Sequence, residues 1–150
     1  MPHGEISEII PASSDRVFKL LHDYDRRLEW DTLLREAYLE PGHSAAAKDA
    51  VSVCKGRWMV GGIAMRTVYV SYDPPNVAAV KMLNRPPLFE SWAASIRHES
   101  VSDGASRVTY KYTFTTRPRF LRFLLDPILS RLFRWETARR LRSLKRYFEQ

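Results

Sequence analysis

The sequence predicts an α+β domain in which a curved antiparallel sheet of about seven strands wraps around one long C-terminal helix. Residues 126–150 carry apolar side chains at spacings of three and four, which is typical of one buried helix face. Residues 35–116 instead change to a period of two, in six segments separated by turn residues. One strand and two short helices precede them. With 150 residues, the chain is expected to form a single domain over 1–150.

The N-terminal elements are predicted from alternation and from a helix cap. Residues 4–10 alternate and predict the first strand. A turn follows at residues 11–15, where Ser13 or Ser14 is expected to cap a helix. The apolar side of that helix consists of Val17, Phe18, Leu20 and Leu21. A second short helix is expected over 24–33, with apolar contacts at Leu28, Trp30 and Leu33.

Six further strands are bounded by proline, glycine, asparagine or aspartate, and residues 43–48 form a polar loop between two of them. The strands are expected at residues 35–40, 49–58, 63–72, 77–83, 88–99 and 107–116. The last segment alternates most clearly, and one face carries Val108, Tyr110, Tyr112 and Phe114. This alternation favours a half-buried antiparallel sheet.

The closing helix is predicted to begin at Asp126, as N-cap, with Pro127 at its first helical position. Its buried face is expected to consist of Leu129, Phe133, Thr137, Leu141, Leu144 and Phe148. Residues 117–125 predict a separate short helix that ends at a proline joint. Additional apolar residues, Ile128, Leu132 and Trp135, widen the apolar surface near the start of the closing helix. They are expected to cover a core, a pocket, a lipid surface or the interface of a homodimer.

Charge is unevenly distributed along the chain. The net charge is +7, and residues 117–146 contain ten basic residues and two acidic ones. Either this segment is a solvated helix face, or it binds phosphate, nucleic acid or an anionic membrane. Nucleic-acid binding is the weakest of these interpretations, because no recognised motif or stacking platform accompanies the charge.

Cysteine content and hydropathy indicate the compartment. The single cysteine, Cys54, excludes an intramolecular disulfide and favours a reducing environment. The first residues show no secretory pattern, and no apolar run is long enough to cross a bilayer. We therefore expect a soluble cytoplasmic protein, either a monomer or a homodimer.

Several segments resemble a known superfamily. They are Trp30-Asp31, Tyr72-Asp73-Pro74-Pro75, residues 84–92 and residues 136–141. Together with the element order, they are similar to START-like (SRPBCC) helix-grip proteins, and in particular to the bacterial polyketide cyclase/dehydrase-like branch. This superfamily also includes Bet v 1-type allergens and lipid-transfer START domains. The resemblance covers essentially the whole chain and implies a ligand cavity between the sheet and the closing helix.

The sequence predicts neither a metal site nor a cofactor. The four histidines are scattered, and none pairs with another at ligand spacing. Gly61-Gly62 is too short for a phosphate loop and is expected to open a strand rather than a helix. No nucleophile elbow is present. Cys54 is expected to be a small buried side chain, with a reactive thiol as the alternative.

Candidate cavity residues come from the strands and the closing helix. The apolar and aromatic candidates are Trp58, Met65, Tyr69, Met82, Trp92, Tyr110, Tyr112, Phe133 and Thr137. Arg66, Arg97 and His98 are the polar candidates, since arginine can hold a carboxylate and histidine can exchange a proton. They could equally face solvent, because a bulge in a strand moves side chains to the other face.

Two function classes follow. The first is binding or transport of a small hydrophobic ligand of lipid, polyketide or isoprenoid type. A separate interpretation adds possible transient contact of the basic helix with an anionic membrane, from which the cavity would take or deliver a lipid. The alternative is a polyketide aromatase/cyclase-like enzyme that uses polar groups in the same cavity. The two classes differ in whether an acid or base points into the cavity.

Overall fold

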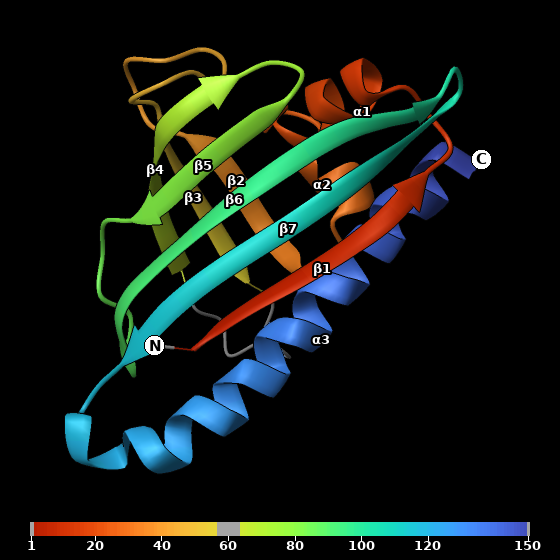
Figure 1. Ribbon diagram of the computed structural model, residues 1–150. Coiled ribbons are helices and arrows are strands. Elements are labelled where there is room, and N and C mark those ends of the chain that lie inside the picture. The colour runs from red at the N-terminus through yellow and green to blue at the C-terminus, as the bar shows by residue number, and fades with distance from the viewer. Residues whose placement is uncertain (1, 57–63, 150) are drawn as a thin grey trace.

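The computed structural model describes residues 2–56 and 64–149, and it confirms the predicted fold class (Figure 1). One antiparallel sheet of seven strands has the order β1-β7-β6-β5-β4-β3-β2. In chain order the elements are β1 (His3–Ile10), α1 (Ser14–Leu21), α2 (Arg27–Trp30), β2 (Leu34–Leu39), β3 (Val51–Gly56), β4 (Ala64–Asp73), β5 (Val77–Met82), β6 (Phe89–Ser102), β7 (Ala105–Thr116), the 3₁₀ turn η2 (Arg119–Leu121) and α3 (Arg122–Glu149).

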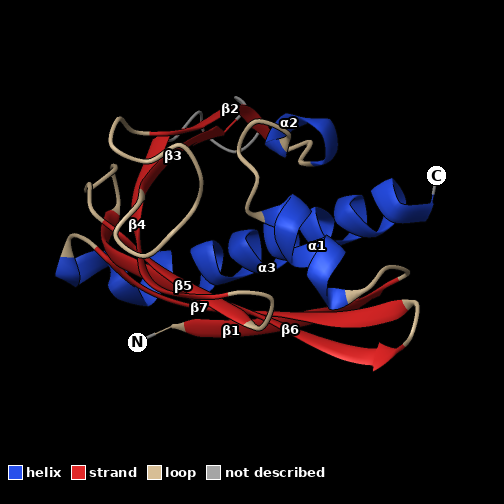
Figure 2. Cartoon of the chain, turned by 90° about the horizontal axis from the view of Figure 1, so that it is seen from above, coloured by secondary structure: helices blue, strands red, loops and turns tan. Residues whose placement is uncertain are grey.

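The sheet curls so that α3 lies inside it. Figure 2 shows α3 with β1, β6 and β7 on one side and with β2 and β3 on the other. The two edge strands, β1 and β2, are joined by α1 and α2, which cross the open side of the curl. Gly4 pairs with Tyr112 across β1 and β7. A Cβ atom on Gly4 would lie 2.4 Å from the hydroxyl oxygen of Tyr112, so a glycine at this position leaves room for the tyrosine ring.

The first two helices agree with the sequence in position and differ in length. Ser13 caps α1 by accepting a hydrogen bond from the amide of Arg16 (3.4 Å), and the four predicted apolar residues are buried. The second helix was predicted over 24–33 but comprises only Arg27–Trp30. Asp31 is extended, and its carboxylate accepts the amide of Leu33 (3.2 Å), which ends the helix early.

The closing helix buries the predicted face. Leu129, Phe133, Thr137, Leu141 and Leu144 are buried, and Phe148 packs against the core. The predicted start was wrong, because α3 begins at Arg122 and Pro127 lies within it. A proline removes one backbone donor, and Pro127 is the sixth residue of α3, past the four donors that are unpaired at any helix start, so α3 lacks one hydrogen bond in its second turn. Asp126 is not a cap: its carboxylate accepts the hydroxyl of Thr116 (2.6 Å), which ties α3 to the end of β7.

The separate short helix predicted over 117–125 is also corrected. It consists of η2 followed directly by the first turn of α3. In Figure 1 this end of α3 projects beyond the sheet. Although α3 is long enough to cross a bilayer, neither it nor any other helix among the described residues is apolar enough to do so.

Candidate functional site

A cavity lies between the inner face of the sheet, the α1–α2 region and α3. Its volume is about 130 Å³, measured as the space open to the centre of a water molecule. Aromatic and aliphatic side chains from the sheet and α3 form most of its wall, among them Phe89, Trp92 and Phe133. An engineered apolar cavity of about 150 Å³ holds benzene, so this space suits roughly one ring without movement of the chain.

Most of the apolar residues predicted from the sequence line this cavity. Met65, Tyr69, Trp92, Tyr110, Tyr112, Phe133 and Thr137 do so. Met82 is partly buried and packs against the core without lining the cavity. Trp58 lies outside the described residues. The seven lining residues are therefore the candidates for ligand contact.

The three polar candidates lie elsewhere. Arg66 is on the outer face of β4, where its Nη2 donates to Glu40 (2.8 Å). Arg97 is exposed on β6 because its neighbour Ile96 takes the inward position. His98 is buried, but it packs against Phe18 (4.9 Å between ring centroids) rather than lining the cavity. The strand alternation, which the sequence alone could not place on one face or the other, turned Arg66 and Arg97 outwards. His98 lies on the inner face with Ile96, but it contacts α1 instead of the cavity.

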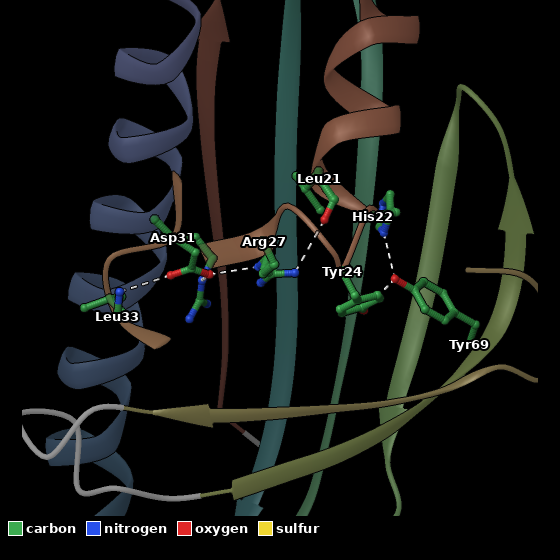
Figure 3. A network of polar contacts seen from close by, with 8 residues as sticks. Leu21, His22, Tyr24, Arg27, Asp31, Leu33 and Tyr69 are labelled. Carbon is green, nitrogen blue, oxygen red and sulfur yellow. Dashed lines mark hydrogen bonds and ion pairs between the residues drawn. The ribbon is translucent and has the colours of Figure 1, made fainter. Parts of the chain in front are cut away.

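Three side chains form a neutral hydrogen-bonded chain along one side of the cavity, which we call the hydroxyl wall: His22, Tyr24 and Tyr69. Figure 3 shows the Tyr69 hydroxyl between the other two. It lies 2.8 Å from His22 Nδ1 and 2.7 Å from the Tyr24 hydroxyl. His22 comes from the end of α1, Tyr24 from the following turn and Tyr69 from β4.

Burial holds each member of the hydroxyl wall in its neutral form. It raises the pKa of Tyr24 to about 12 and raises that of Tyr69 well above its ordinary value. It lowers the pKa of His22 well below its usual range, and the nearby His98 adds to this effect. Burial therefore moves all three pKa values away from neutral pH.

Three ionic side chains form a second group, which we call the charged cluster: the buried Arg27 and Asp31 and the half-buried Arg140. Asp31 Oδ2 accepts Arg27 Nε at 3.0 Å and Arg140 Nε at 2.8 Å. Figure 3 shows Arg27 and Asp31 at α2, and Arg140 reaches Asp31 from α3. Asp31 is 1% exposed and Arg27 is 8% exposed. The cluster joins α2 to α3, and both arginines line the cavity.

The members of the charged cluster keep one another ionised against burial. Burial alone would raise the pKa of Asp31, but the guanidiniums of Arg140 and Arg27 outweigh it and lower that pKa. Burial likewise opposes the charge on Arg27, and the Asp31 carboxylate outweighs it, so the pKa of Arg27 rises. Glu136 lines the cavity beside the cluster, and burial raises its pKa while Arg140 opposes the shift.

Two further polar groups line the β3–β4 side of the cavity. The hydroxyls of Ser52 and Thr67 are 2.8 Å apart, and both residues are buried. Burial raises the pKa of the Cys54 thiol, so this side chain holds its proton and is poorly suited to act as a nucleophile. The described residues contain no group of three or more histidine, cysteine or acidic side chains placed to hold a metal ion.

Sequence reasoning missed the charged cluster, and of the hydroxyl wall it identified only Tyr69. One signal was available: Arg27 and Asp31 are four residues apart, which allows an ion pair on one helical turn. Arg140 was hidden among the surrounding basic residues, because the helical period alone does not show which arginine meets a buried acid. His22, Tyr24 and Tyr69 come from three separate segments, and only the fold brings them together.

Comparisons with known proteins agree with this architecture. The protein XoxI from Bacillus cereus is 18% identical, with a TM-score of 0.80 over 100% of this chain and 97% of that one. A START superfamily protein from Mycobacterium smegmatis is 9% identical, with a TM-score of 0.81 over 100% and 99%. The Zhui aromatase/cyclase from Streptomyces sp. R1128 is 15% identical, with a TM-score of 0.81 over 98% and 93%. At these identities the matches establish the fold.

No protein with a curated description matches the chain by sequence. The family model described as polyketide cyclase / dehydrase and lipid transport matches residues 1–149. The predicted resemblance to START-like helix-grip proteins is thereby confirmed. The family model covers nearly the whole chain, and the seven-stranded sheet curls around the closing helix. The chain therefore belongs to the polyketide cyclase / dehydrase and lipid transport family.

Proposed function

We propose that this protein binds and carries a small hydrophobic ligand of lipid, polyketide or isoprenoid type. The observation that carries this proposal is the cavity, which is lined mainly by aromatic and aliphatic side chains and has a few polar groups at its walls. Because its volume is only about 130 Å³, a ligand larger than roughly one ring requires α3 or the α1–α2 region to move outwards.

The test combines native mass spectrometry of the purified protein with titration of Prodan, a neutral naphthalene dye. We expect a retained apolar molecule, or saturable dye binding at one site. Thr137→Phe fills the cavity from α3 and is expected to abolish binding, since Thr137 is 3% exposed and lines the cavity. Arg142→Phe places the same side chain on the exposed face of α3 and should leave binding unchanged. Dye binding that survives Thr137→Phe would contradict the proposal.

An aromatase/cyclase-like activity is the second candidate, and the hydroxyl wall is the observation in its favour. A hydrogen-bonded chain of imidazole and two phenols could relay a proton to a ligand. Efficient acid–base catalysts have pKa values near the working pH, whereas burial shifts those of His22, Tyr24 and Tyr69 away from it. Carrier function is therefore favoured. Turnover of an added poly-β-ketone that is lost in Tyr69→Phe would reverse this preference.

We also propose that ligand exchange takes place at an anionic membrane. Phe120 in η2 and Phe123 at the start of α3 are 75% and 79% exposed, and Leu124 and Ile128 are at least half exposed. Arg119, Arg131 and Arg134 are exposed in the same part of the chain. Apolar side chains among arginines are typical of helices that lie in a membrane interface, and each basic residue near anionic lipid contributes roughly 1 kcal/mol.

The membrane proposal predicts co-sedimentation with phosphatidylglycerol-containing vesicles and much weaker binding to phosphatidylcholine alone. The double variant Phe120→Ser/Phe123→Ser should lose this binding. Val101→Ser is the matched control, because Val101 is also exposed (43%) but lies at the β6–β7 end of the sheet. Binding that does not depend on anionic lipid, or that survives the double variant, would overturn the proposal.

A further inference from the structure

The charged cluster contains more positive charge than its own structure needs. Asp31 is shared by two guanidiniums, so Arg27, Asp31 and Arg140 together carry a net charge of one positive unit. Moving an ion out of water costs several kcal/mol, which a single partner offsets only in favourable geometry. Two guanidiniums share one carboxylate, so one positive charge of the cluster has no acidic partner within it.

The donors of the two guanidiniums are only partly used. A guanidinium carries five N–H donors. Among the described residues, Arg140 donates from its Nε to Asp31, and no acceptor meets its Nη atoms. Arg27 donates from its Nε to Asp31 and from its Nη1 to the carbonyl of Leu21 at 3.5 Å, which is a long contact. The side chains of Arg140 and Arg27 are only 16% and 10% exposed, and none of their nitrogens is among the fully buried polar atoms of the described residues that lack a partner, so the free donors remain accessible to a small molecule.

Both arginines line the same cavity that the proposed function assigns to a hydrophobic ligand. From this geometry we propose that Arg27 and Arg140 form a binding site for a carboxylate, and that the ligand is therefore an amphiphile with an apolar body and an anionic head. The apolar body contacts the aromatic side of the cavity, formed by residues such as Phe89 and Phe133. The head accepts N–H groups that Asp31 leaves free. This inference rests on the proposed function and specifies its ligand class.

The physical basis is the strength of charge-assisted hydrogen bonds away from water. A guanidinium presents its donors in a planar fork that matches the two oxygens of a carboxylate. Asp31 holds both forks in place through their Nε atoms, so little side-chain entropy remains to be lost when a ligand binds. Glu136 is the other acidic side chain of this wall and competes with the ligand for Arg140 when it is ionised.

The test uses a pair of probes with the same shape and different charge, β-naphthoate and β-naphthamide, measured by isothermal titration calorimetry at neutral pH. The wild-type protein is expected to bind naphthoate at least about tenfold more tightly than naphthamide, a difference of about 1.4 kcal/mol. Arg140→Met should remove this preference by weakening naphthoate about tenfold, whereas naphthamide, which offers only a neutral acceptor, should lose much less affinity. Retained naphthamide binding also shows that the cavity of the variant is intact.

Two controls separate the cluster from general surface charge. Arg134→Met removes an exposed arginine of the same helix and should keep the preference for naphthoate. Glu136→Gln should keep or increase it, since it removes the competing carboxyl. If wild-type protein binds both probes equally, the carboxylate site is overturned while the hydrophobic carrier function stands. If Prodan binds and Thr137→Phe abolishes its binding, but neither naphthoate nor naphthamide binds, the carboxylate site is overturned as well.

Discussion

The two polar regions of the cavity stabilise their buried polar side chains in opposite ways. In the hydroxyl wall, burial suppresses charge, and the three side chains hydrogen-bond to one another as neutral groups, with His22 Nε2 left without a partner among the described residues. In the charged cluster, mutual attraction outweighs burial, and all three side chains remain ionised. The hydroxyl wall therefore resembles a polar part of the core, whereas the charged cluster retains unused donors beside the cavity.

This difference has an energetic consequence. A neutral buried hydrogen bond contributes about 1 kcal/mol net, and replacing both partners by apolar groups can be almost neutral. Removing one partner of a buried ion, by contrast, leaves a charge that the interior cannot solvate, which is far more costly than leaving one neutral group unpaired. The charged cluster should therefore be more sensitive to single substitutions than neutral buried pairs are.

Asp31→Ala should be the most destabilising change. It leaves Arg27 and Arg140 close together and without their shared carboxylate, which is expected to cost about 3–5 kcal/mol of unfolding free energy. Urea unfolding of the purified variant measures this. The control is Glu29→Ala, which removes the exposed partner of Arg26 and should cost less than about 0.5 kcal/mol. Equal losses in the two variants would contradict the role assigned to the cluster.

His98→Phe should change the pH dependence of stability. Burial lowers the pKa of His98 to about 4, whereas an unfolded chain has a histidine pKa near 6.5. Between these values the unfolded state binds more protons, so stability is complete above about pH 6.5 and falls as the pH drops towards 4. The loss from His98 is about 3 kcal/mol over this window.

The measurement is the unfolding free energy of wild-type and His98→Phe proteins at several pH values from 4 to 7. The difference between the two curves isolates His98 from the other acid-sensitive groups, His22 and Asp31. His43→Phe, in an exposed loop, should follow the wild-type curve. Parallel curves for His98→Phe and wild type would show that His98 is not held neutral by the fold.

The smallest effect is expected at the neutral pair Ser52 and Thr67. Ser52→Ala or Thr67→Val alone leaves one buried hydroxyl unpaired and should cost about 1–2 kcal/mol. The double variant removes both hydroxyls and should cost less than the sum of the two single variants. A double-mutant cycle by urea unfolding tests this. Strictly additive losses would show that the two hydroxyls do not depend on each other.

The fold was largely predictable because its signals are local and periodic. The structure confirms the buried faces predicted from the alternation in residues 107–116 and from the three-and-four spacing on α3, since one face of each element had to be buried. The errors are at element ends. Asp31 ended α2 early by accepting the Leu33 amide, and the bond from Thr116 to Asp126 let α3 begin before Pro127. Both bonds involve neighbours that periodicity does not describe.

The candidate site was predictable only in its apolar part. Phe133, Thr137 and Tyr112 were found because they lie on faces that must be buried. The cavity is an unfilled space between those faces. Arg66 and Arg97 were plausible by residue type, but the strands turn them outwards. The members of the charged cluster were missed, because Asp31 and Arg140 are 109 positions apart in the sequence and meet only in the fold.

The sequence by itself determined the fold class, the number of strands and the buried face of the closing helix, because each depends on a repeating pattern of apolar side chains within one element. Only the tertiary structure decided which polar side chains face the cavity and which charges they retain. Those properties depend on distances between elements far apart in the chain. Burial and partner charge, which set each pKa, arise only once the sheet has closed around α3.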